Sequence, residues 1–209
     1  MKLIKRKITI HGDKAVFILT PYEINKHISA GHDNKGFSVI WGNGSGFLYL
    51  AKCFSIAAKL CKNEILYLPI KYQASKDFIE TFQDFDYNNS IICTNYCETQ
   101  LSPKEIEDIL KIKVWTEDIV IRNPQIITEY IDRWKTERRL TVKFHKKNMY
   151  ISTNKDGFHS LSCGAYHLTE YGDEYMENFL PHMHFDWNEN TAASVGATLY
   201  YWSDRINNI

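Results

Sequence analysis

The chain has 209 residues, of which 44% are hydrophobic and 24% charged, a composition typical of a globular protein with a packed core. Its 25 basic and 25 acidic side chains balance, so no overall field favours nucleic acid, an anionic membrane or a strongly charged partner. Five scattered cysteines and the lack of any apolar run of ~18 residues favour reduced thiols in a cytoplasmic protein with no membrane partner.

The first half of the chain predicts the order strand, strand, helix, strand, strand. The expected strands are 15–20, 37–41, 65–70 and 90–96, and the expected helix is 46–61. The stretch IWGNGSGFLYL, residues 40–50, marks the corner between a strand and this helix. It would suit a dinucleotide phosphate only if a G-x-G-x-x-G motif were complete, but Phe47 stands where the last glycine belongs. We therefore predict a turn with Ser45 as the helix N-cap, and no nucleotide partner.

A connecting segment follows, with two helix-start patterns. Ser102 and Asn123 each precede a proline, which is the arrangement of an N-cap followed by proline at the first helical position. Apolar side chains after the second start, such as Ile127 and Trp134, share one helical face. We expect both helices to pack across the junction between the two halves.

The second half repeats the first at an offset of 111 positions. VIWGNGSGFLYLAKCFSIA aligns with YISTNKDGFHSLSCGAYHL, so that Gly46 meets Gly157 and Phe47 meets Phe158, and Asp156 becomes the second expected N-cap. The expected strands are 139–145, 148–153, 182–187 and 194–202, around a helix at 157–171.

These patterns predict an α+β fold of two tandem, similar strand-strand-helix-strand-strand units. Each unit is expected to form an antiparallel sheet with a helix on one face. The predicted boundaries are 1–101 for the first unit, 102–136 for a helical connector and 137–209 for the second unit. Phe47 and Phe158 are expected at equivalent buried positions.

The strongest candidate for a reactive or metal-binding site is the stretch HMHFDW, residues 182–187. Its His182, His184 and Asp186 alternate along a predicted strand, so the three side chains share one face and could bind a metal ion. However, no H-E-x-x-H motif, nucleophile or orienting partner accompanies them. The C-terminal quarter is also crowded with aromatic residues, which suit a protein interface where they reach the surface. The predicted partner-binding residues are His182, His184, Trp187 and Tyr201, with no cofactor.

A family resemblance rests on these same segments. The glycine turn, the helix GFLYLAKCFSIAAKL, the strand HMHFDW and a closing strand begun by Ser194 resemble the small α+β immunity proteins of bacterial polymorphic toxin systems. The resemblance covers residues 37–61 and 150–202. It implies a non-enzymatic protein that neutralises a cognate protein toxin by direct binding.

The chain also departs from that family. It carries two units and a long insertion, its first unit lacks the histidines, and its charge is neutral where an inhibitor of a nucleic-acid-cleaving toxin is expected to be acidic. Two alternatives stay open: a metal-dependent hydrolase that uses His182, His184 and Asp186, and a ligand-binding or scaffold protein. The sequence identifies neither the partner nor the oligomeric state.

Overall fold

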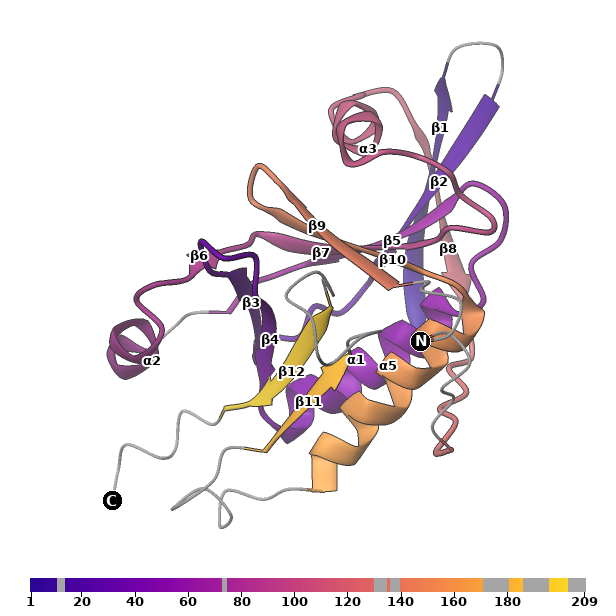
Figure 1. Cartoon of the computed structure of the whole chain (residues 1–209). Helices are drawn as coiled ribbons and strands as arrows, with labels where there is room; N and C mark the ends of the chain where they lie inside the picture. Colours follow the sequence, from indigo (N-terminus) through magenta and orange to yellow (C-terminus); the bar gives the residue numbers. More distant parts are fainter. Residues whose placement is uncertain are drawn as a thin grey trace.

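In the computed structural model, the chain folds into two mixed β-sheets and a central pair of helices (Figure 1). The structure describes residues 1–10, 14–72, 75–129, 135, 140–170, 181–185 and 196–202. The arrangement confirms the predicted α+β class. Within these described ranges, no helix combines the length and apolar character needed to cross a membrane.

The larger sheet has seven strands in the order β8-β1-β2-β5-β7-β10-β9. Its strands are β1 (Lys2–Ile10), β2 (Lys14–Pro21), β5 (Glu64–Pro69), β7 (Ser90–Asn95), β8 (Thr116–Ile121), β9 (Leu140–His145) and β10 (Asn148–Thr153). Two neighbouring pairs, β2 with β5 and β7 with β10, are parallel, and the others are antiparallel. One face of this sheet carries apolar side chains toward the central helices.

The smaller sheet has five strands in the order β11-β12-β4-β3-β6. Its strands are β3 (Ile28–His32), β4 (Ser38–Gly42), β6 (Asp86–Tyr87), β11 (His182–Phe185) and β12 (Ala197–Tyr201). Strands β4 and β12 pair in parallel, although they lie far apart in the sequence. The inner face of this sheet turns toward the same helices, so both sheets contribute to one core.

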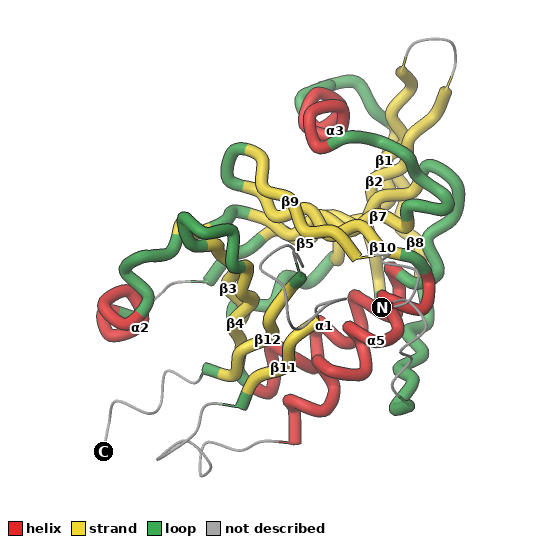
Figure 2. The backbone as a smooth tube through the Cα atoms, in the orientation of Figure 1, coloured by secondary structure: helices red, strands yellow, loops and turns green. Residues whose placement is uncertain are grey.

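Two long helices, α1 (Gly44–Ala57) and α5 (Lys155–His167), lie side by side against the inner faces of the sheets (Figure 2). The shorter elements are α2 (Lys76–Thr81), α3 (Pro103–Leu110) and the 3-10 helix η2 (Leu168–Glu170). Helix α3 covers part of the outer face of the seven-stranded sheet, where Ile106 and Ile109 pack against Ile8 and Ile65. Helix α2 inserts Phe78 against the outer face of the five-stranded sheet.

The two predicted units do not each build an antiparallel sheet of their own. In both sheets, strands from residues 1–101 pair with strands from residues 137–209. The pairing pattern is nevertheless the same twice: β5-β7-β10-β9 and β11-β12-β4-β3 each read antiparallel, parallel, antiparallel. The reason is that each long helix carries the chain across the core from one sheet to the other. A duplication in the history of the chain stays a prediction.

The corners that start α1 and α5 have the same geometry, but the predicted N-caps were wrong. The caps are Asn43 and Asn154, whose side-chain oxygens accept hydrogen bonds from the Gly46 and Gly157 N–H groups, both at 2.9 Å. Each asparagine has an extended backbone and lies three residues before the donor, the geometry that N-capping requires. Ser45 and Asp156 already belong to the first helical turn, as do the equivalent residues Gly44 and Lys155.

The repeated glycine has a packing reason in both corners. A Cβ atom at Gly46 would lie 2.4 Å from the His27 carbonyl oxygen, and one at Gly157 would lie 2.0 Å from the Thr153 hydroxyl oxygen. The repeated phenylalanines, Phe47 and Phe158, are both 0% exposed, which confirms their predicted burial. The glycine therefore allows chain segments to approach closely at the corner. The Gly46 N–H group already donates its hydrogen bond to the Asn43 side chain.

Of the two predicted connector helices, the first exists, and between Asn123 and the end of the predicted connector the structure describes only residues 123–129 and Lys135, of which Lys135 is helical. Helix α3 begins after Ser102 with a capping box, in which Ser102 and Glu105 exchange hydrogen bonds, and with proline at its start. The helix predicted after Asn123 was wrong for residues 123–129, which have no helical structure. There the Gln125 backbone exchanges hydrogen bonds with the Ser55 hydroxyl on α1, a tertiary contact that replaces helical bonds. Trp134 lies outside the described residues.

Candidate functional site

The outer face of the five-stranded sheet collects the side chains that the sequence singled out. Because successive residues of a strand point to opposite faces, β11 places Met183 and Phe185 toward the core and its two histidines outward. On β12 the same alternation buries Leu199 and turns Tyr200 outward. We call the outward group the histidine face; its members are His182, His184, Thr198, Tyr200 and the neighbouring Phe37.

The two histidines lie next to each other, with ring centroids 4.8 Å apart and ring planes at 85°. His182 also stacks on Tyr200, at 5.8 Å and 22°, directly across the β11–β12 pair. His184 Nδ1 lies 3.1 Å from the Thr198 hydroxyl oxygen, so one ring nitrogen is held and its tautomer is linked to the hydroxyl orientation. Two neighbours therefore fix both imidazoles in place.

The open side of the histidine face carries flat, partly apolar groups. His184 is exposed, and Phe37, 45% exposed, lies 6.5 Å from it between ring centroids. Burial raises the pKa of Tyr200, so its hydroxyl stays protonated at neutral pH and can donate a hydrogen bond. The combination of imidazole, phenyl and phenol groups suits contact with another molecule better than it suits isolation in water.

The other predicted site residues do not lie on the histidine face in the described structure. Tyr201 is 3% exposed and packs on Phe47 in the core, so its prediction as a surface residue was wrong. The cause is its parity on β12, which is opposite to that of Tyr200. Asp186 and Trp187 lie outside the described residues. Within the part of the chain that the structure describes, no three His, Cys, Asp or Glu side chains gather as a metal site.

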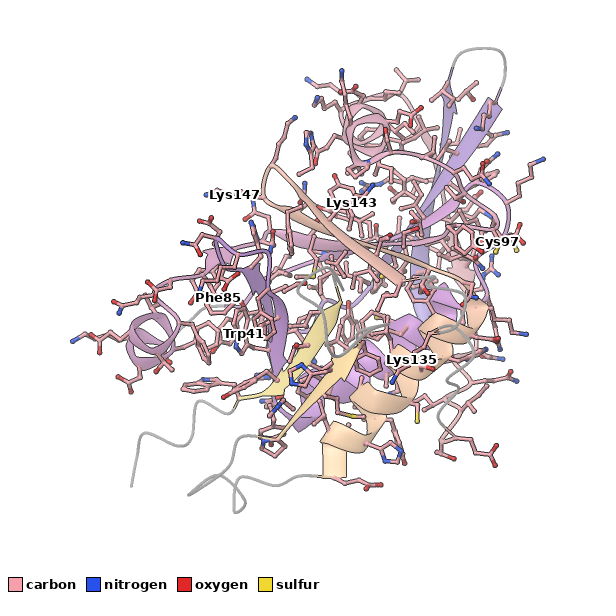
Figure 3. All side chains as sticks on the ribbon, in the orientation of Figure 1. Trp41, Phe85, Cys97, Lys135, Lys143 and Lys147 are labelled. Atoms are coloured by element: carbon pink, nitrogen blue, oxygen red, sulfur yellow. The ribbon has the colours of Figure 1, made fainter. Side chains whose placement is uncertain are left out.

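Beside the histidine face, an aromatic cluster closes the rest of the sheet surface. Trp41 lies at its centre, 5.5 Å from Phe78 and 5.1 Å from Phe85 between ring centroids (Figure 3). Gly31 leaves room for this ring, because a Cβ atom there would come within 3.1 Å of it. The remaining members of the cluster are Tyr72, Phe82, Tyr87, Tyr200 and Trp202. The cluster joins the histidine face through Tyr200.

Other potentially reactive groups are buried or have a structural role. Burial raises the pKa of the Cys53 thiol to about 12, and it raises that of Cys93 well above its ordinary value, so neither is a thiolate nucleophile at neutral pH. Glu107 on α3 accepts hydrogen bonds from Asn148 and from the Tyr150 hydroxyl, the latter at 3.0 Å, and so fixes α3 to β10. These groups leave the histidine face as the best candidate site.

Sequence reasoning found the histidines but missed Phe37 and Thr198. Phe37 precedes β4, and only the parallel pairing of β4 with β12 brings it to β11. The alternation in ATLYY was the available signal for Thr198 and Tyr200. Comparisons of the chain with protein-family models, with curated proteins and with solved structures find no match.

Proposed function

We propose that this chain is a non-enzymatic protein-binding module, and specifically an immunity protein that neutralises a cognate bacterial toxin by direct binding through the histidine face. The resemblance of residues 37–61 and 150–202 to small α+β immunity proteins supplies the family. The structure supports a binding role with a single observation: exposed His184 lies beside His182 and half-exposed Phe37 on an ordered sheet surface.

The physical argument is one of rigidity. Each histidine already contacts a neighbour that restricts it, His182 through Tyr200 and His184 through Thr198. The two side chains would therefore lose little conformational entropy when a partner binds them. Aromatic side chains on a rigid surface are the usual anchors of protein interfaces, and a few central residues carry most of the binding energy. The core beneath them, formed by Phe185 and Leu199, is fully buried and keeps the surface in shape.

The test uses the protein encoded directly upstream, where the toxin of an immunity protein is expected. Both proteins are purified, and their dissociation constant is measured by titration calorimetry beside rescue of cells that express the toxin. Substituting His182 and His184 together by Ala, or Phe37→Ala alone, should weaken binding by about 10-fold or more each, as expected for interface anchors. The control is Ile79→Ala, which changes a 49% exposed side chain on α2.

The expected result is loss of affinity and rescue in the histidine-face variants, with unchanged thermal stability, while Ile79→Ala behaves like the wild type. Trp187→Ala belongs in the same series, because the sequence predicts it as a partner-binding residue. Full rescue by the double histidine variant would reject this face as the binding surface. No binding to the upstream product and no rescue by the wild type would reject the immunity role.

A second function, a metal-dependent hydrolase, has one supporting observation, the 4.8 Å separation of the two imidazole rings. His182, His184 and Asp186 would supply the ligands. Elemental analysis of the purified protein separates the two proposals. One zinc ion per chain, lost in the double histidine variant, would favour the hydrolase and would overturn the binding proposal for this face.

A further inference from the structure

Strand β8 is an edge of the seven-stranded sheet (Figure 1), and it carries exposed apolar side chains. Its Ile119 and Ile121 are 56% and 77% exposed, and the two residues that lead into it, Val114 and Trp115, are 83% and 41% exposed. Half of the eight exposed large hydrophobic side chains in the described residues thus lie within 114–121. Such a concentration typically marks an interaction surface.

The free edge of β8 presents the backbone of the same isoleucines. The Arg122 N–H donates to the Met1 carbonyl across the β1–β8 pair, so even-numbered residues of β8 face β1. In an antiparallel pair, the intervening residues turn their N–H and C=O groups away from the partner. Ile119 and Ile121 therefore direct both their backbone groups and their apolar side chains to positions that another strand would use.

Three of the usual protections against pairing are missing from this strand. Natural edge strands are blunted by proline, by lysine or by a bulge, whereas β8 reads TEDIVI and pairs with β1 in a continuous register. Its charges are only Glu117, which is paired with Arg6 at 3.0 Å, and Asp118. The strand is therefore open to main-chain hydrogen bonding.

We propose that β8 pairs antiparallel with β8 of a second copy, which joins the two seven-stranded sheets around a twofold axis at Val120. In this register, Ile119 of each copy lies opposite Ile121 of the other, which buries both. Asp118 lies opposite Arg122 of the second copy, a pair of opposite charges formed twice. Arg122 is 32% exposed and bonds Glu64 of β5 at 2.8 Å on the interior side of β8, so its guanidinium turns outward from Glu64 to meet Asp118 of the second copy.

Self-complementarity is what selects a second copy as the occupant. Moving the twofold axis by two or three residues, from Val120 to Asp118 or to Glu117, places Asp118 opposite Asp118, or Glu117 opposite Glu117, and like charges directly opposite each other are unfavourable. The chain as a whole has a formal net charge of +0, so two copies do not repel one another. Closed twofold dimers are the commonest oligomers. This inference is independent of the proposed function, because the histidine face belongs to the other sheet.

Sedimentation velocity over a range of protein concentrations tests the proposal. The wild type should shift from monomer to dimer with increasing concentration, and Ile119→Lys should remain monomeric with an unchanged far-UV spectrum. The matched control is Ile79→Lys, since Ile79 is 49% exposed on α2, and this variant should still dimerise. A wild type that stays monomeric up to millimolar concentration overturns the proposal, as does a dimer that survives Ile119→Lys.

A cross-link tests the register and does not depend on the lysine variant. Opposed residues of a non-hydrogen-bonded antiparallel pair lie about 4.5 Å apart between Cα atoms, within reach of a disulfide. With exposed Cys61 and Cys97 changed to Ser, Val120→Cys should give a covalent dimer on mild oxidation. Thr116→Cys, which lies far from its own copy in this register, should not. Equal cross-linking of the two variants, or none, contradicts the pairing.

Discussion

The glycine corner offers a sharp test, because two glycines in the same turn of α1 differ only in what surrounds them. A Cβ atom at Gly44 would have its nearest neighbour at 3.7 Å, an ordinary contact, whereas one at Gly46 would lie 2.4 Å from the His27 carbonyl oxygen. The same Cβ would also lie 2.9 Å from a methyl carbon of Ile28. We therefore compare Gly44→Ala with Gly46→Ala.

The expected sizes follow from two opposing effects. Replacing glycine by alanine in a compatible conformation stabilises a protein by about 0.4 to 1 kcal/mol, because the unfolded chain loses freedom. Gly44→Ala should show this gain. At Gly46 the same gain is opposed by overlap with backbone that must retreat to at least 3.0 Å, and overpacking of this kind costs about 1 to 3 kcal/mol. Because the gain is common to both variants, their free energies of unfolding should differ by the overpacking cost, about 1 to 3 kcal/mol.

Urea unfolding followed by tryptophan fluorescence measures both variants against the wild type. Similar denaturant dependence in all three proteins would show that the variants differ in stability and not in the compactness of the unfolded state. The reasoning is refuted if the two variants agree within about 0.5 kcal/mol, a difference too small for a backbone overlap. It is also refuted if Gly46→Ala is the more stable of the two.

Three further predictions use the same unfolding assay. Asn43→Ala should cost about 1 kcal/mol through loss of the N-cap, whereas Ser45→Ala should stay within about 0.5 kcal/mol; the reverse order would restore Ser45 as the cap. Phe158→Ala should cost about 3 to 5 kcal/mol, because the ring is 0% exposed, and a cost under about 1 kcal/mol would contradict this burial. Burial raises the pKa of Glu64. The Cys61 N–H, Lys5 and Arg122 lower that pKa by more than burial raises it, so the net shift is downward. The ionised Glu64 carboxylate therefore stabilises the fold above its unfolded pKa of about 4.3, and this stabilisation is lost as the pH falls. Glu64→Gln should destabilise the protein at pH 7 but much less at pH 3. An equal loss of stability at both pH values would contradict the charge argument.

The sequence by itself determined the parts of the fold that depend on local pattern. Short apolar runs rich in β-forming residues placed β4, β5 and β7 within a few residues, and helical periodicity found α1 and α5. The proline after Ser102 located α3. The parity of HMHFDW was enough to put His182 and His184 on one face, because strand geometry fixes that relation wherever the strand lies.

Only the tertiary structure decided how these elements pair. Strands β1 and β8 were missed because much of their surface is exposed, which leaves little alternation to detect. The exchange of strands between sheets also left no local signal, since parallel pairing of β4 with β12 joins segments more than 150 residues apart. That pairing buries Tyr201 in the core, places partly buried Tyr200 on the outer face and brings Phe37 to His184. The candidate site thus depends on which distant strands pair and in which register. No local pattern in the sequence shows that pairing.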